Sequence, residues 1–195
     1  MLFRSLVYVS TAGVFGPEDA VNPKPMTHYG AQKLAIEGAA RAYHADHGLP
    51  SIGFRPYIVY GPGRSSGIAA GPSIAIEAAY RGAKAEIKFS GRVGFVHVYD
   101  VASLMVAAVS HPMSGAEAYT LAGDTTEMTA FLAALHAEVP DGQIDVRGAA
   151  LRIPADLETS PMPALLAAVP VTRVSKGIRE TLAHYRARDT GEAVQ

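Results

Sequence analysis

The sequence contains no cysteine among its 195 residues. This absence excludes disulfide bonds, thiolate catalysis, and zinc or iron–sulfur sites with cysteine ligands. No apolar run approaches the ~20 residues of a membrane span, and Leu6–Val9 is too short for a signal-peptide core. The 17 basic and 18 acidic residues nearly cancel, so no net field attracts nucleic acid or anionic membrane. We therefore predict a cytoplasmic protein that binds neither nucleic acid nor membranes.

What is present is typical of a globular α/β chain, with 49% hydrophobic and 18% charged residues. Strands are expected at Leu6–Val9 and Ser51–Tyr60, and a helix between them from about Thr27, its N-cap, to about His47. Further along, we expect helices near residues 72–82, 101–110 (capped by Asp100), 127–138 and 177–188, and short strands near residues 87–89, 94–98 and 119–121. Alternating strands and helices predict a layered α/β fold with parallel strand pairing.

Three residues form a constellation that suggests chemistry. Tyr29 and Lys33 are four apart, so on a helix they share one face. An ammonium near a phenol stabilises the phenolate, and such a tyrosine can exchange a proton with a carbinol near neutral pH. Thr11, at the end of the first strand, could hydrogen-bond the same oxygen. An isolated pair of this kind is more often a surface helix with an extended lysine, so the neighbouring residues must decide.

Four stretches occur in order along the chain: Val7-Tyr-Val-Ser-Thr-Ala-Gly-Val-Phe-Gly16, Tyr29-Gly-Ala-Gln-Lys33, Phe54-Arg-Pro-Tyr-Ile-Val-Tyr-Gly-Pro62 and Phe95-Val-His-Val-Tyr-Asp-Val101. This series resembles the extended short-chain dehydrogenases/reductases, the NAD-dependent epimerase/dehydratase family. The resemblance implies the C-terminal part of a Rossmann-like parallel sheet with a small α/β substrate-binding region. Residues 1–62 would hold the Rossmann-like part with the catalytic motif. Residues 63–195 would mainly bind substrate, with residues 95–110 returning to the Rossmann-like part.

The resemblance also implies roles for individual residues. Thr11 would polarise the substrate oxygen, Tyr29 would be the acid/base, and Lys33 would hold the nicotinamide ribose beside Tyr29. Pro56 and Tyr57 match the segment that passes the nicotinamide. Substrate contacts are expected from Thr11, Ala12, Ile58, Arg64 and Arg92. The implied function is an NAD(P)-dependent oxidoreductase or epimerase that acts by hydride transfer on a hydroxyl or keto group of a sugar-like small molecule, with NAD or NADP as cofactor.

The family's glycine-rich opening has no counterpart in this sequence. That opening is a strand followed by a Gly-x-x-Gly-x-x-Gly turn that receives the cofactor pyrophosphate. Gly61-Pro-Gly-Arg-Ser-Ser-Gly67 follows the wrong strand and has one residue too many. The adenosine-binding half would therefore be missing, leaving an apolar strand edge at Leu6–Val9. The alternative is an N-terminally truncated, inactive remnant or a substrate-binding module that binds no dinucleotide by itself. The expected partners are a missing N-terminal half, which would supply the adenosine-binding part, or a second copy of the chain in a homodimer.

Smaller departures concern the substrate. The family's dehydratases carry an Asp-Glu pair where this chain has Ala12 and Gly13, which disfavours sugar dehydration. Many nucleotide-sugar members have an asparagine where Ile58 stands and an arginine where Val93 stands. Losing both removes a neutral donor and a charge-assisted clamp for a diphosphate. A UDP- or TDP-sugar is therefore disfavoured, although Arg64 or Arg92 could compensate.

Histidines offer weaker candidates. His44 and His47 with Asp46 have a spacing that a metal could use, but they fall on a polar helix end, and no metal site is expected. His97 lies in an apolar strand and is interpreted as a packed, hydrogen-bonded residue rather than a base.

Overall fold

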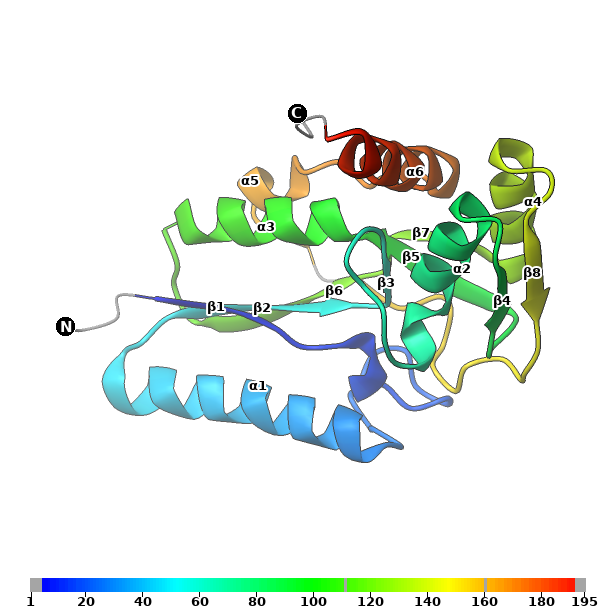
Figure 1. Ribbon diagram of the computed structural model, residues 1–195. Coiled ribbons are helices and arrows are strands. Elements are labelled where there is room, and N and C mark those ends of the chain that lie inside the picture. Colours follow the sequence, from blue (N-terminus) through cyan, green and yellow to red (C-terminus); the bar gives the residue numbers. More distant parts are fainter. Residues whose placement is uncertain (1–4, 111, 160, 192–195) are drawn as a thin grey trace. The chain divides into compact units, whose positions relative to one another are not determined.

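The computed structural model of the protein describes residues 5–110, 112–159 and 161–191, which form two compact units (Figure 1). The first unit contains the residues up to Tyr57, Tyr99–Ala122 and Arg152–Pro170. The second contains Ile58–Val98, Gly123–Leu151 and the residues from Val171 onward. The functional division expected near residue 62 stays a prediction.

The first unit is built on a three-stranded parallel sheet. Its strands β1 (Leu6–Val9), β2 (Ser51–Pro56) and β6 (Ala116–Leu121) lie in the order β1-β2-β6. Helix α1 (His28–His47) covers one face, and α3 (Val98–Ser110) and α5 (Ala164–Ala167) lie over the other (Figure 1). Helices on both faces of a parallel sheet confirm the α/β fold class predicted from the sequence.

Helix α1 begins and ends as its sequence predicts. The Thr27 side chain accepts a hydrogen bond from the Gly30 N–H at 3.0 Å, which satisfies one free donor of the first turn. Gly48 adopts a left-handed conformation with φ of 64°, and its N–H donates to the His44 carbonyl. Between these caps only Gly30, Glu37 and Ala40 are buried. The buried residues of this helix are therefore two small residues and one carboxylate.

The single strand predicted over Ser51–Tyr60 is wrong, because the chain bends at Tyr57. Strand β2 ends at Pro56, and β3 (Ile58–Tyr60) belongs to a different sheet in the second unit. Pro56 has no N–H to continue a ladder. The Tyr57 N–H instead donates to the Leu121 carbonyl at 3.2 Å, and the Tyr57 hydroxyl donates to the Ile153 carbonyl at 2.8 Å.

The second unit combines two small sheets with three helices. Strand β5 (Arg92–His97) pairs in parallel with β3 and antiparallel with β7 (Asp124–Glu127), while β4 (Lys84–Ile87) pairs in parallel with β8 (Gln143–Val146). The helices are α2 (Gly71–Tyr80), α4 (Met128–Glu138) and α6 (Val174–Thr190), and α6 packs against both others. The core contains the Phe95 and Phe131 rings, stacked at 4.9 Å, with the Tyr60 ring edge-on to both.

Several elements differ from expectation. Helix α3 begins at Val98, so Asp100 lies in its first turn rather than capping it. Strands β7 and β8 and helix α5 were not expected. Two 3-10 helices, η1 (Ala12–Val14) and η2 (Ile68–Ala70), also occur. Among the helices of the described residues, none is long and apolar enough to cross a membrane.

Candidate active site

The Thr11 segment follows the end of β1 and turns immediately into η1. Thr11 is the N-cap of η1, and its Oγ1 accepts a hydrogen bond from the Gly13 N–H at 3.1 Å. The side chain is half-buried, whereas Ala12 is fully buried. Because a hydroxyl can accept and donate at once, the Thr11 O–H is able to donate to a second oxygen.

Tyr29 and Lys33 lie in the first two turns of α1. The Lys33 Nζ donates to the Val9 carbonyl at 2.9 Å and lies 5.9 Å from the centroid of the Tyr29 ring. The Tyr29 side chain is 56% exposed. The ammonium is therefore held between the last carbonyl of β1 and the ring of Tyr29.

A glycine allows α1 to approach the Thr11 segment closely. A Cβ built at Gly30 would overlap the Gly13 carbonyl, so only glycine permits this contact. The first turn of α1 thus lies directly on η1. The structure brings together the segments of Thr11, Tyr29 and Lys33, which are separate in sequence.

Pro56 and Tyr57 lie at the carboxyl end of β2, and both are buried. Burial raises the pKa of the Tyr57 phenol above its ordinary range, and the protonated hydroxyl donates to the Ile153 carbonyl. Tyr57 therefore fixes the bend after β2 with its side chain. Its predicted contact with a cofactor stays a prediction.

The remaining substrate candidates lie in the second unit. Ile58 on β3 and Val93 on β5 are both buried in the core, with Ile58 only 2% exposed. Arg64 is half-buried in the loop after β3, and its Nε has no hydrogen-bond partner in the described part of the chain. Arg92 is exposed at the start of β5. The roles of these side chains, and of Ala12, stay predictions.

Sequence reasoning missed a buried polar network beside the candidate residues. Glu37 is fully buried; its Oε1 accepts from Ser10 Oγ at 2.5 Å and from Arg55 Nε at 2.8 Å. Its Oε2 accepts from Arg55 Nη2 at 2.6 Å, which completes a two-pronged ion pair. One signal could have revealed it: Glu37 follows Lys33 by four residues, so it lies on the same face of the helix.

A polar cavity of about 240 Å³ lies in the first unit near the carboxyl ends of β2 and β6. Ligands of parallel α/β sheets usually bind at this edge. Its lining comprises Phe15, Val21, Arg55, Thr120, Glu158, Thr159 and Pro161. Within the described residues, no group of three or more histidine, aspartate or glutamate side chains could hold a metal ion.

His97 was expected to be a packed residue. It is fully buried in the second unit, and its Nε2 lies 3.3 Å from Thr181 Oγ1. Because Thr181 already donates to the Gly177 carbonyl, the His97 ring is the donor in this contact. The interpretation of His97 as a hydrogen-bonded core residue is confirmed.

A comparison against known families agrees with the parallel sheet that helices cover on both faces. The chain belongs to the NAD dependent epimerase/dehydratase family, whose model matches residues 2–122. The family resemblance inferred from the four motifs is thereby confirmed. No curated protein sequence matches the chain.

Solved structures with the same fold are longer than this chain. A partial-consensus L-threonine 3-dehydrogenase is similar over 94% of this chain and 66% of its own, with 21% identity and a TM-score of 0.78. The UDP-N-acetylglucosamine 4-epimerase from Methanobrevibacter ruminantium M1 has 18% identity over 95% and 64% of the two chains, with a TM-score of 0.74. The UDP-glucuronic acid 4-epimerase from Bacillus cereus, in complex with NAD, has 19% identity over 97% and 62%, with a TM-score of 0.70. The chain thus spans about two thirds of their length.

Proposed function

We propose that this chain carries the catalytic residues of an NAD-dependent oxidoreductase or epimerase that acts on a hydroxyl or keto group of a sugar-like small molecule. The observation that carries the proposal is the position of the Lys33 ammonium, fixed by the Val9 carbonyl beside Tyr29 and next to the Thr11 turn. We place this reaction in the cytoplasm, consistent with a cysteine-free composition.

The residues fit the nicotinamide end of the cofactor. Lys33 uses one of its three N–H donors on Val9, so two remain for ribose hydroxyls. Tyr29 is sufficiently exposed to reach both a ribose and a substrate. The sequence offers no glycine-rich turn for the pyrophosphate, so the fit does not extend to the adenosine end, nor does it distinguish NAD from NADP. When bound, the nicotinamide supplies a hydride acceptor or donor.

The proton chemistry follows from the side chains of this chain. The Thr11 hydroxyl donates to the substrate oxygen while its Oγ1 stays oriented by the Gly13 N–H. Tyr29 takes the hydroxyl proton during oxidation and returns it during reduction. The Lys33 ammonium stabilises the phenolate, which is the form of Tyr29 before it accepts the proton in oxidation and after it donates the proton in reduction. Ala12 and Gly13 carry no carboxylate, so elimination of water from a sugar is not proposed.

A second substrate class is favoured by two core residues. Ile58 and Val93 are buried and apolar, so neither offers a hydrogen bond or charge to a nucleotide diphosphate. A small hydroxy compound without a nucleotide, of the kind named in the L-threonine 3-dehydrogenase structure, is therefore the second candidate. The exposed Arg92 and the Arg64 Nε are the cations that could favour a nucleotide sugar instead.

We further propose that a dinucleotide-binding polypeptide segment pairs with β1. This strand stands at the end of its sheet, with only β2 beside it among the described residues. An apolar groove of about 330 Å³ lies beside the start of β1, where it meets α1, and is lined chiefly by Leu6, Ile36, Ala39, Ala40, Tyr43 and Leu49. An open apolar edge is a template for another strand. A second copy of this chain on the same edge is the competing outcome, visible as a dimer by sedimentation.

The experiment has two arms. The first titrates the chain with NADH and NADPH and follows nicotinamide fluorescence; micromolar binding is expected if the nicotinamide contacts suffice. The second measures turnover with UDP-sugars, free sugars and L-threonine, comparing Tyr29→Phe with Tyr99→Phe. Tyr99 lies on α3, away from the groove, and is also an exposed tyrosine, at 42%, so it serves as the control.

Tyr29→Phe should lower turnover about 10²–10⁴-fold with cofactor affinity nearly intact, and Tyr99→Phe should leave turnover unchanged. Equal turnover in both variants would refute the acid/base assignment. An absence of dinucleotide binding at millimolar concentration, together with no turnover of any substrate, would favour an inactive remnant or a substrate-binding module.

A further inference from the structure

We infer that Glu37 is a positioning residue that fixes α1 relative to the ends of β1 and β2, the three segments that carry the candidate catalytic and cofactor-binding residues. This inference rests on the proposed function. Glu37 lies on α1 one turn after Lys33 and two turns after Tyr29, on the helix face that meets the sheet. Its carboxylate is fully buried. No step of the proposed chemistry uses it.

The carboxylate connects each segment by a short hydrogen bond. Ser10, which donates to it, directly precedes Thr11, and the Ser10 N–H also donates to the Phe54 carbonyl at 2.6 Å. Arg55, which contributes both other bonds, directly precedes Pro56. One side chain thus joins α1 to the end of β1 and the end of β2.

Arg55 extends the network to the other end of the Thr11 turn. Its guanidinium carbon lies 5.4 Å from the centroid of the Phe15 ring, which is a cation–π arrangement. Phe15 immediately follows η1 and is buried. The turn that carries Thr11 is therefore anchored before it by Ser10 and after it by Phe15, both through the same ion pair.

The network is better suited to setting geometry than to adding stability. A buried ion pair often contributes no more than apolar residues of similar volume, because removing its charges from water is costly. The planar fork of Arg55 on both carboxylate oxygens nevertheless allows only one relative orientation. Since α1 buries little besides Gly30, Glu37 and Ala40, few other contacts would stop it from rotating on the sheet.

A small rotation of α1 has a direct consequence for the site. Lys33 Nζ would move away from the Val9 carbonyl, and Tyr29 would move relative to Thr11. A displacement of about 1 Å in a catalytic group can lower the rate about 10²-fold. We therefore expect Glu37→Gln to lower kcat about 10²-fold while KM changes less than about threefold.

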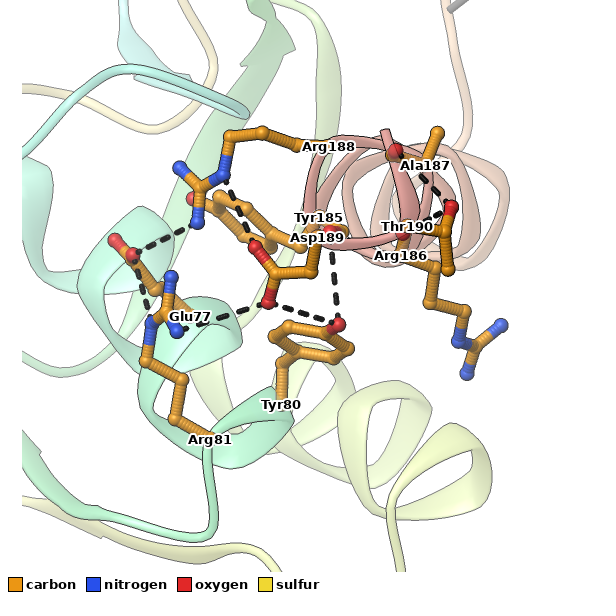
Figure 2. Close-up of polar contacts among 9 residues, drawn as sticks. All are labelled: Glu77, Tyr80, Arg81, Tyr185, Arg186, Ala187, Arg188, Asp189 and Thr190. Atoms are coloured by element: carbon orange, nitrogen blue, oxygen red, sulfur yellow. Dashed lines mark hydrogen bonds and ion pairs between the residues drawn. The ribbon is translucent and has the colours of Figure 1, made fainter. Parts of the chain in front are cut away.

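The experiment compares four variants of the full chain, each assayed with added NAD. Glu37→Gln keeps the shape and removes the charge, and the double variant Glu37→Leu/Arg55→Met replaces the pair with apolar residues. Glu77→Gln is the matched control, because Glu77 also pairs with arginines but lies on α2 in the second unit, as Figure 2 shows. Tyr29→Phe reports separately on the proposed function.

The double variant separates positioning from stability. We expect it to recover the thermal stability that Glu37→Gln loses while kcat stays about 10²-fold low, and Glu77→Gln to keep full kcat. Recovery of kcat together with stability would show a structural role and overturn the inference. Normal kcat in Glu37→Gln beside an inactive Tyr29→Phe would also overturn it. If Tyr29→Phe is fully active, the proposed function itself fails.

A second readout does not depend on activity. Hydrogen exchange of the Gly13, Phe15 and Gly30 amides reports the Thr11 turn and the start of α1, because each donates to a nearby acceptor. In Glu37→Gln and in the double variant we expect these amides to exchange about tenfold faster, with α2 amides unchanged. Unchanged protection at all three amides would overturn the inference.

Discussion

Helices α1 and α6 are of similar length but are held by different forces. Of the 20 residues of α1 only three are buried, and the largest of these is the charged Glu37. Of the 17 residues of α6 six are buried, including Ile178, Leu182 and Tyr185. Directional bonds therefore place the helix that carries Tyr29 and Lys33, whereas apolar area places α6. Such bonds specify orientation more narrowly than an apolar contact does.

If directional bonds hold α1, the largest loss of stability should follow removal of the Glu37–Arg55 ion pair. Glu37→Ala leaves the Arg55 guanidinium, whose side chain is only 14% exposed, without its counter-ion. We expect the free energy of unfolding to fall by about 3–5 kcal/mol, and the apolar double variant Glu37→Leu/Arg55→Met to recover most of it. Urea denaturation measures both. A loss below about 1 kcal/mol for Glu37→Ala would mean that directional bonds do not hold α1.

The second prediction concerns the apolar packing of α6. Leu182 is fully buried, so Leu182→Ala leaves a cavity and should lower the free energy of unfolding by about 3 kcal/mol. Leu165→Ala on α5, where leucine is half-exposed, is the control and should cost much less. The same urea titration distinguishes the two. Equal losses would contradict the assignment of α6 stability to buried area.

The third prediction concerns a single directional bond in the first unit, the hydrogen bond of the Tyr57 hydroxyl after the end of β2. Tyr57→Phe removes the hydrogen bond to Ile153 and should cost about 1 kcal/mol at pH 7. Burial raises the pKa of the folded Tyr57 phenol above the ordinary value of about 10, so this residue adds no pH dependence to stability well below that pH. Above about pH 10, Tyr57 loses its proton in the unfolded chain before it does so in the folded one, so its contribution to stability falls as pH rises.

Measuring the free energy of unfolding as a function of pH tests this predicted decrease. The Tyr57→Phe curve should fall less steeply above about pH 10 than that of the unmodified chain, so the gap between them narrows. Tyr43→Phe, which replaces an exposed tyrosine, is the control and should change the free energy of unfolding at pH 7 by less than about 0.5 kcal/mol. A gap that widens at alkaline pH would contradict the raised pKa.

The local signals in the sequence predicted the elements that they control directly. The limits of α1 follow from Thr27 and Gly48, and β1 follows from a continuous apolar run. Strand β7 reads Asp-Thr-Thr-Glu, which has no strand pattern; it forms because β5 offers it an antiparallel edge. The bend at Tyr57 was missed because the Leu121 and Ile153 carbonyls, which accept hydrogen bonds from Tyr57 at the bend, are distant in sequence.

The residues of the candidate site to which recognisable motifs assign a role could be predicted from the sequence, whereas the other residues of the site could not. Thr11, Tyr29 and Lys33 were predicted from their spacing and the motifs around them, and the structure brings their segments together through contacts with Val9 and Gly13. Their catalytic roles stay predictions. The network of Ser10, Glu37 and Arg55 was missed, because serine, glutamate and arginine in separate segments resemble surface residues. Only the fold shows that one carboxylate is surrounded by both partners.

The smallest effect is expected in the ion cluster between α2 and α6, where directional bonds also occur but lie in solvent (Figure 2). Arg81 Nε lies 3.1 Å from Glu77 Oε1, and Arg81 Nη1 lies 3.8 Å from Asp189 Oδ2. Beneath them the Tyr80 and Tyr185 rings stack at 5.8 Å and supply apolar contact. Arg81→Gln should lower Tm by no more than about 2 °C, and the difference should vanish in about 1 M salt. A decrease in Tm that is independent of salt and as large as that of Leu182→Ala would contradict the contrast between the two helices, because α6 would then depend on directional bonds as α1 does.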